Sequence, residues 1–334
     1  MKQLILIGLT LLLLSSCSTP PAHKTDQAQA TEITWPAPPL KTRIKYLYQF
    51  SDPTDLEIHQ SLLSRFWGWL SGRNLNSGMV RPYTIAVKDQ LMVVTDPGKK
   101  VVHLFNTASS DYLQIERAKD TYLASPVGAA IGNDSIYISD SILGTIFIFT
   151  KEGQFSHSIE GLNRPTGLFF DNKNKKLYVS DTLNHTIIVY NHKGEKEFSF
   201  GQRQKKGGDF NFPSHLALNN DRLFVNDTMN FRIQSFDLAG KFINSFGKHG
   251  DSSGYFSQPK GIGVDSKGHI YVVDAIFHRV QIFDQTGKYL MAFGSQGRKA
   301  GEFWLPSGLF IHQDKIYVAD SYNRRVQVFQ YVGG

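Results

Sequence analysis

The sequence predicts an all-β fold, a six-bladed β-propeller, from three features that repeat along the chain. An aspartate is followed nine residues later by an aromatic residue in six places, and successive aspartates are 44, 41, 46, 47 and 46 residues apart. A strand-like run precedes each aspartate, and a proline opens each unit. This period, with several short strands per unit, is typical of propellers, in which stacked blades bury the faces that one blade leaves open. The six pairs are Asp96/Phe105, Asp140/Phe149, Asp181/Tyr190, Asp227/Phe236, Asp274/Phe283 and Asp320/Phe329.

Each repeat contains the elements of one four-stranded blade. The first strand follows the proline, and a glycine stands two residues after that proline in four repeats. A second strand, such as 315–320, alternates apolar and β-branched residues up to the aspartate. A third strand, such as 325–329, begins after a tight turn, and a hairpin then leads into a fourth, such as 288–293. The opening prolines are Pro82, Pro126, Pro165, Pro213, Pro259 and Pro306.

Residues 43–50 are predicted to close the ring. The sixth repeat ends soon after Phe329 and has no fourth strand, whereas Lys45–Phe50 matches Lys288–Phe293 in character at each position. We therefore expect 43–50 to form the outer strand of the last blade. The aliphatic residue six positions after each aspartate, and the aromatic residue nine positions after it, are expected to fill the layers between blades.

The first residues predict export and a lipid anchor. Residues 1–16 have a positive start at Lys2 and an apolar run that is short for a membrane span. The run ends in the sequence LSSC (14–17), which resembles the bacterial lipobox, in which the cysteine is lipidated. Cys17 is the only cysteine, so no disulfide can form within the chain. Ser18 at the next position resembles sorting to the outer membrane in Gram-negative lipoproteins; an ordinary cleaved signal with an incidental cysteine is the alternative.

Two further segments precede the repeats. Residues 17–40, which begin with the lipidated cysteine, are rich in Pro, Ala, Thr and Gln and predict a flexible tether to a propeller domain at 41–334. Residues 55–72 depart from the repeat, because their apolar side chains fall on one helical face. They are predicted to form a helical insert that packs over the propeller. The alternative is a helix that contacts a membrane or a partner.

The charge balance restricts the partners. The chain has 36 Lys and Arg residues against 29 Asp and Glu residues, a formal net charge of +7. A basic balance would suit nucleic acid, but export argues against that partner. An envelope protein or an anionic envelope polymer remains, together with the membrane that the lipid anchor would hold. The propeller is expected to be monomeric.

The turns after the later aspartates resemble the NHL repeat. Residues 227–233 (DTMNFRI) and 320–326 (DSYNRRV) share the spacing of Asp, Asn and Arg, and a Gly-x-Phe-x-x-Pro linker precedes three blades. The resemblance covers about residues 79–331. It weakens in the first two repeats, where Val101 and Thr145 stand at the arginine position. It implies a six-bladed NHL propeller of the bacterial lipoprotein type.

The aspartate and arginine of these turns are predicted to be structural braces. Five residues apart across a tight turn, they can form a bidentate ion pair that ties two strands. An active site needs one arrangement of side chains in the molecule, whereas a structural brace is needed in every blade. No residue is therefore predicted to be catalytic. The predicted brace pairs are Asp227/Arg232, Asp274/Arg279 and Asp320/Arg325.

Binding is expected at the rim formed by the linkers before the prolines and the turns after the aspartates, which emerge at the same end of the propeller and vary between repeats. This rim is rich in cations and aromatic residues, which often dominate binding energy; an ordinary solvated surface is the alternative. His215 occupies a position that glycine holds in four other repeats and is expected to point toward the central channel. The predicted rim residues are Lys100, His185, His215, Phe231, Tyr255, His278, Arg298, Trp304 and Arg324.

These features favour a lipid-anchored, extracytoplasmic module of the bacterial envelope that binds or scaffolds proteins without catalysis, a role that NHL propellers in ubiquitin ligases and receptor kinases also fill. The resemblance leaves open a propeller enzyme of the metal-dependent lyase or lactonase type. Peptide-amidating lyases resemble NHL propellers and hold zinc with channel-mouth histidines, but only His215 stands there, and catalytic zinc needs about three protein ligands. No metal or other cofactor is therefore expected. A third possibility is electrostatic binding of an anionic envelope polymer, which salt would weaken.

Overall fold

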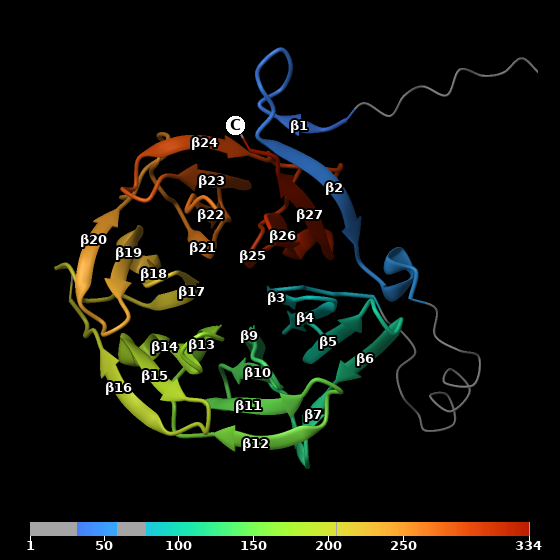
Figure 1. The fold of residues 1–334 in the computed structure, drawn as a ribbon, viewed down its shortest axis with the longest axis vertical. Helices are drawn as coiled ribbons and strands as arrows, with labels where there is room; N and C mark the ends of the chain where they lie inside the picture. Colours follow the sequence, from blue (N-terminus) through green and yellow to red (C-terminus); the bar gives the residue numbers. More distant parts are fainter. Residues whose placement is uncertain (1–31, 59–77, 205, 334) are drawn as a thin grey trace, which may run out of the picture. The chain divides into compact units, whose positions relative to one another are not determined.

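The computed structural model describes residues 32–58, 78–204 and 206–333, which form six blades around a central axis (Figure 1). Each blade is one antiparallel sheet, and its first strand lies nearest the axis. The second and third strands of every blade are almost wholly buried, as their alternating apolar and β-branched residues predict. The predicted all-β, six-bladed propeller is confirmed.

The strands follow the chain from the first blade to the last. Blade 1 contains β3 (Thr84–Lys88), β4 (Leu91–Asp96), β5 (Val101–Asn106) and β6 (Asp111–Ile115), and blade 2 contains β9 (Pro126–Ile131), β10 (Ser135–Asp140), β11 (Thr145–Thr150) and β12 (Phe155–Ile159). Blade 3 contains β13 (Pro165–Asp171), β14 (Lys176–Asp181), β15 (Thr186–Asn191) and β16 (Lys196–Phe200), and blade 4 contains β17 (Pro213–Asn219), β18 (Arg222–Asp227), β19 (Arg232–Asp237) and β20 (Phe242–Phe246). Blade 5 contains β21 (Pro259–Val264), β22 (Ile270–Asp274), β23 (Arg279–Phe283) and β24 (Tyr289–Phe293), and blade 6 contains β25 (Leu309–His312), β26 (Lys315–Asp320), β27 (Arg325–Tyr331), β2 (Ile44–Phe50) and β1 (Thr34–Trp35). A small hairpin of β7 (Arg117–Ala118) and β8 (Thr121–Tyr122) lies in the linker between blades 1 and 2.

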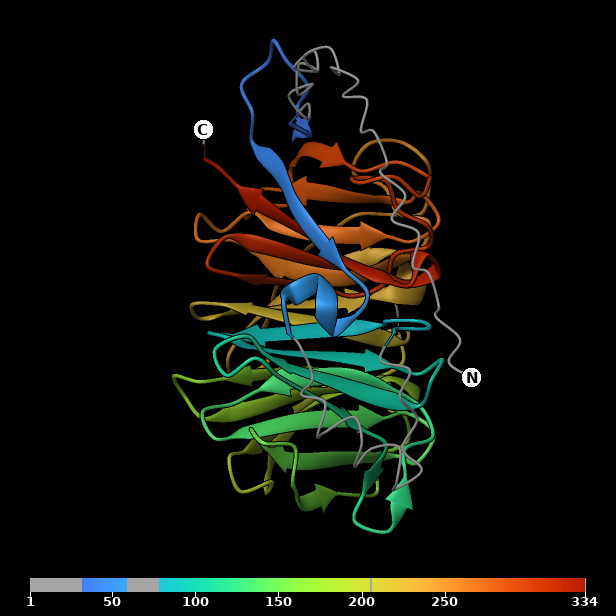
Figure 2. The ribbon, with the colours of Figure 1, turned by 90° about the vertical axis from the view of Figure 1, so that its right-hand side faces the viewer.

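The last blade is closed by the N-terminal strand β2, as predicted for residues 43–50. β2 pairs antiparallel with β27, from Ile44 opposite Tyr331 to Phe50 opposite Val326. Figure 2 shows β2 crossing the outside of this blade before the chain enters the 3₁₀ turn η1 (Pro53–Leu56). The pairing places strands from both ends of the described chain in one sheet, so the ring closes without a gap between the first and last blades.

The folded domain begins earlier than the predicted boundary at residue 41. Thr34–Trp35 forms β1, which pairs with β2. The centroid of the Trp35 ring lies 5.6 Å from that of Phe293 and 5.7 Å from that of Phe329. The predicted tether is therefore wrong for residues 34–35, because a single tryptophan in a segment rich in Pro and Ala finds an aromatic site on the last blade.

The layers between blades are filled by the two apolar positions that the repeat predicts. The aliphatic residue six after each aspartate is 0 % exposed, and the aromatic residue nine after it is at most 6 % exposed, in every blade. One cluster joins Phe50 and Val326 of the last blade to Ile85 and Phe105 of the first. Apolar packing thus continues across the junction where the ring closes.

Some predicted segments lie outside the described residues. These are the signal at 1–16, Cys17, the tether up to residue 31, and most of the helical insert predicted at 55–72. The insert's first two residues, Asp55 and Leu56, belong instead to the 3₁₀ turn η1. Among the residues that the structure describes, no helix is long and apolar enough to span a membrane.

Candidate functional site

The six repeated aspartates hold the linkers that enter each blade. Each aspartate is at most 1 % exposed, and its carboxylate accepts at least one backbone N–H from the residues just before the opening proline, at 2.6–3.2 Å. Because linker and turn meet at the same carboxylate, both lie on one face of the propeller. We call this face, formed by the four residues after each aspartate and by the linkers, the turn face. The six turns are residues 97–100, 141–144, 182–185, 228–231, 275–278 and 321–324.

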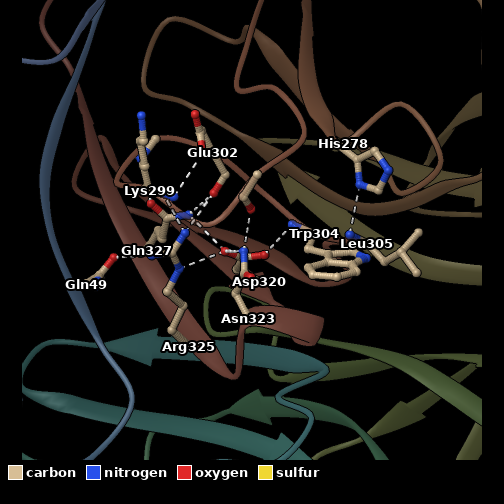
Figure 3. A network of polar contacts seen from close by, with 12 residues as sticks. Gln49, His278, Lys299, Glu302, Trp304, Leu305, Asp320, Asn323, Arg325 and Gln327 are labelled. Carbon is tan, nitrogen blue, oxygen red and sulfur yellow. Dashed lines mark hydrogen bonds and ion pairs between the residues drawn. The ribbon is translucent and has the colours of Figure 1, made fainter.

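In the last blade the aspartate lies at the centre of a larger network (Figure 3). Asp320 Oδ2 accepts hydrogen bonds from Asn323 at 2.8 Å, from Arg325 Nε at 2.8 Å and from Gln327 at 3.0 Å. Arg325 Nη2 also donates to two linker carbonyls, at 2.8 and 2.9 Å. The guanidinium therefore ties the turn, the third strand and the linker of one blade together.

Blade 4 repeats this network. Asp227 Oδ2 accepts from Asn230 at 2.9 Å, from Arg232 Nε at 2.8 Å and from Gln234 at 3.0 Å. The ion pairs predicted in blades 4 and 6 are thus both present, but each is formed by Nε alone and is not bidentate. Burial raises the pKa of Asp227 and of Asp320, and the surrounding hydrogen-bond donors oppose that rise.

The glutamine of the network is a finding of the structure. It stands seven residues after the aspartate in blades 4, 5 and 6, as Gln234, Gln281 and Gln327, and is 0 % exposed. In each case its amide donates to a linker carbonyl, and its Oε1 accepts a linker N–H. The signal is present in the sequence, because the strands RIQSF, RVQIF and RVQVF each place one amide among residues that will be buried, and a buried amide needs partners.

The third predicted ion pair, between Asp274 and Arg279, is not formed. The Cζ atom of Arg279 lies 4.7 Å from the centroid of the Phe277 ring. Its Nε and Nη2 atoms are buried and have no hydrogen-bond partner among the described residues. Phe277 stands three residues after the aspartate, where blades 4 and 6 have Asn230 and Asn323. An aromatic face at this position attracts the guanidinium, so the predicted brace is wrong for blade 5.

The fourth residue after each aspartate has a left-handed backbone, with φ between 52° and 63° in all six blades. The turn conformation at this position is therefore the same in every blade, whereas the exposed fraction of the side chain differs from blade to blade. Lys100 and Arg324 are exposed, whereas Phe231 is half-buried. Variation at this position does not by itself mark an accessible surface.

His185 and His278 occupy this fourth position after the aspartate, and each hydrogen-bonds to a linker. The Nδ1 atom of His185 accepts the N–H of Phe212 at 3.2 Å, and that of His278 accepts the N–H of Leu305 at 3.0 Å (Figure 3). Both acceptor contacts reach the linker of the next blade. Burial lowers the pKa of both histidines, and nearby Arg203 adds to the effect at His185.

A second set of turn residues is both apolar and exposed. Two positions after the aspartate, five blades carry a large hydrophobic side chain that is 40–72 % exposed. A single exposed apolar residue is ordinary, but five at equivalent positions on one face form a repeated apolar surface. Their exposure follows from the turn and was not evident from the strand pattern. These residues, the apolar tips, are Ile142, Leu183, Met229, Ile276 and Tyr322.

Cations of the turn face lie over aromatic rings. In three pairs, the Cζ of an arginine or the Nζ of a lysine lies within 5.1 Å of a ring centroid. None of these cations forms an ion pair with an acid in the part of the chain that the structure describes. The face is therefore cationic with interleaved aromatic rings, and a binding role for it stays a prediction. The pairs are Arg298/Trp304 at 4.7 Å, Lys248/Tyr255 at 4.3 Å and Arg81/Tyr322 at 5.1 Å.

Three side chains from different blades meet at the axis. The ring centroids of Tyr83 in blade 1 and His215 in blade 4 are 5.8 Å apart, although these blades face each other across the ring (Figure 1). Lys260 of blade 5 places its Nζ 5.5 Å from the centroid of the Tyr83 ring. Burial lowers the pKa of His215 to about 3, and the charge of Lys260 adds to the effect. We call these three residues the axial cluster.

The remaining kinds of candidate site are a metal site and two surface hollows. Among the described residues, no group of three or more His, Cys, Asp or Glu side chains could hold a metal ion. On the face opposite the turn face, a hollow of about 220 Å³ is lined by Lys88 and His312, among others. The Lys88 ammonium is already bonded to Asn133 at 2.7 Å and to Asn172 at 2.8 Å. A second hollow, of about 450 Å³, lies between blades 1 and 2 and has charges of both signs.

Comparison with known proteins agrees with the fold. A family model described as a 6-bladed beta-propeller matches residues 205–280 and 265–333, and no curated protein matches the sequence. A catalytically inactive virginiamycin B lyase from Staphylococcus aureus, solved with quinupristin, is 15 % identical with a TM-score of 0.57, and the match covers 78 % of this chain and 98 % of that one. An auxiliary nutrient binding protein from Bacteroides thetaiotaomicron is 12 % identical with a TM-score of 0.61, covering 77 % of this chain and 70 % of that one. A chain of a nidogen/laminin complex is 17 % identical with a TM-score of 0.55, covering 72 % and 86 %.

At these identities the likeness to solved structures shows the fold alone. The sheet topology and the family model together identify the chain as a six-bladed β-propeller.

Proposed function

We propose that the protein is a non-catalytic protein-binding module of the bacterial envelope, a lipid-anchored propeller of the NHL-repeat type that binds its partner on the turn face. In this proposal Cys17 carries the lipid, and the propeller lies outside the cytoplasm, at the outer membrane in a Gram-negative cell. The LSSC sequence at 14–17 supports the anchor. Several acyl chains, at about 0.8 kcal/mol per buried methylene, would make the anchoring stable.

The observation that carries the proposal is the set of apolar tips among cations and aromatic rings. Exposed apolar side chains at five equivalent positions share a face with three cation–aromatic pairs. Arg, Tyr and Trp are enriched among the residues that dominate binding energy in protein interfaces. The conspicuous carboxylates of the same face are already occupied by linker amides, which leaves them little capacity for acid–base chemistry.

A matched pair of double variants tests this proposal. Met229→Ser with Ile276→Ser removes two apolar tips, whereas Ile243→Ser with Leu290→Ser removes side chains on the outer strands that are 43 and 45 % exposed. The full-length protein is cross-linked in its envelope, the captured protein is identified by mass spectrometry, and its affinity for each purified variant is measured. We expect the tip variant to bind at least about tenfold more weakly and the outer-strand variant to bind normally. Equal affinity in the two variants would contradict the proposal.

A second candidate, electrostatic binding of an anionic envelope polymer, is favoured by the cations on this face that have no acidic partner among the described residues. Arg298→Glu with Arg324→Glu should weaken capture in either case, so salt must discriminate between the two candidates. Attraction between exposed charges fades as ionic strength rises, whereas apolar contacts persist. Binding that high salt abolishes and that the tip variant leaves intact would favour the polymer.

A further inference from the structure

We propose that the axial cluster binds an oxyanion, a phosphate or carboxylate group of a small solute, between the Lys260 ammonium, the Tyr83 hydroxyl and the His215 imidazole. This site lies at the channel mouth and does not depend on which partner binds the apolar tips.

The geometry brings the three groups to one point. Tyr83 and Lys260 each stand one residue after an opening proline, and His215 stands two residues after one. Blades 1 and 4 lie opposite each other, so their side chains can meet only near the axis, and the centroids of Tyr83 and His215 are 5.8 Å apart. Lys260 approaches the same ring from blade 5, at 5.5 Å. Three polar side chains from three blades thus surround the end of the channel.

The described residues provide no counter-ion for the positive charge of the cluster. Lys260 is half-buried, and its ammonium has neither an ion pair nor a hydrogen bond within the described part of the chain. Burial lowers the pKa of Lys260, and the charge of Arg81 adds to the effect. Burial raises the pKa of Tyr83, and the charge of Arg164 opposes that rise. A desolvated ammonium without a hydrogen-bond acceptor is unfavourable. A bound oxyanion would provide that acceptor together with the opposite charge.

Three other blades use the equivalent positions to stabilise the fold. In blades 3, 4 and 6, the residue after the proline and the residue after the aspartate form a hydroxyl pair, whereas blade 2 has Val127 and Ser141 there. In blade 5 these positions hold Lys260 and Ala275, so the alanine offers the ammonium no hydroxyl partner. His215 stands in a slot that glycine holds in blades 2, 3, 5 and 6. The hydroxyl pairs are Thr166/Thr182 at 2.7 Å, Ser214/Thr228 at 2.7 Å and Ser307/Ser321 at 2.6 Å.

Isothermal titration calorimetry of the full-length protein tests the site. The probes are inorganic phosphate and citrate, with ionic strength held constant by chloride. We expect saturable binding of at least one probe at a single site, and the preferred probe identifies phosphate or carboxylate chemistry. Lys260→Gln should weaken binding by about tenfold or more, because hydrogen bonds to charged groups contribute strongly. Tyr83→Phe should weaken it less.

The matched control is Lys248→Gln, since that lysine also lies over a tyrosine ring on the turn face but belongs to the linker before blade 5 and not to the axial cluster. It should bind like the unaltered protein, and Lys260→Arg should retain binding because it keeps the charge. Thermal unfolding checks that every variant is folded. If neither probe binds saturably, or if Lys260→Gln and Lys248→Gln bind equally well, the proposal is overturned.

Discussion

The Nη1 atom of Arg325 donates a hydrogen bond to the Oε1 atom of Gln49 at 2.7 Å, which ties the N-terminal strand β2 to the aspartate network of the last blade (Figure 3). The same guanidinium is bonded to Asp320 through Nε. The residue that orders the last turn therefore also fastens the strand that closes the ring. Closure of the propeller and order on the turn face are coupled at this one side chain.

Gln49→Ala is expected to lower the free energy of unfolding by about 1–3 kcal/mol, because it removes an acceptor from a mostly buried guanidinium. Lys45→Ala on the same strand is the control. Its ion pair with Glu32 is 42 and 54 % exposed, so its loss should change stability by less than about 1 kcal/mol. Urea unfolding measures both variants. Equal effects would mean that the bond to Arg325 does not contribute to closure.

The arginines of blades 5 and 6 should differ in their contributions to stability. Arg325→Ala removes an ion pair and leaves the Asp320 carboxylate buried, which should cost about 3 kcal/mol or more. Arg279→Ala removes only the contact with the Phe277 ring and two side-chain nitrogens that have no hydrogen-bond partner among the described residues, so a loss of about 1 kcal/mol or less is expected. Denaturant midpoints compare the two variants, and similar losses would show that the arginine in blade 5 also acts as a brace.

Acid should destabilise the protein partly through His185 and His278. Their Nδ1 atoms accept backbone N–H groups, which a protonated nitrogen cannot do, and their pKa values are lowered in the folded state. Below the ordinary histidine pKa of about 6.5, the unfolded chain therefore binds more protons than the folded chain. Stability is present above that pH and is lost as the pH falls through the folded pKa values.

The double variant His185→Asn with His278→Asn tests this dependence, because asparagine tolerates the left-handed backbone at both positions. Unfolding free energies measured from pH 7.5 down to 5 (about 2.5 units around the histidine pKa) should fall less steeply in the variant than in the unaltered protein. Part of the slope should remain, because burial also lowers the pKa of His103 and of His215. Identical slopes would exclude the two linker contacts as the cause.

The fold could be predicted because its signals are local and repeated. The spacing of the aspartates gives the number of blades, and the likeness of 45–50 to 288–293 gives the closing strand, which β2 confirms. The boundary at residue 41 could not be placed correctly. Trp35 belongs to no repeat, and only the assembled last blade provides the rings of Phe293 and Phe329 against which it packs.

The site was less predictable, because it depends on geometry between repeats. His215 could be singled out as a departure from glycine, but its contact with Tyr83 arises only when blades 1 and 4 face each other. Arg279 keeps the spacing of a brace, yet Phe277 at the asparagine position redirects it. The exposure of the apolar tips could not be predicted, because strand periodicity says nothing about which side chains a tight turn exposes.

The close approach of neighbouring first strands gives the last prediction. A Cβ added at Gly167 would lie 1.9 Å from the carbonyl oxygen of Ser214 in the next blade, a backbone atom that cannot move alone. Gly167→Ala should therefore cost about 3 kcal/mol or more, or prevent folding. Gly161→Ala is the control, because nothing lies within 4 Å of its added Cβ and only a left-handed backbone at φ 81° opposes it, at a cost of about 1 kcal/mol. Circular dichroism and urea unfolding compare the two variants, and equal stability would show that the first strands can separate without loss.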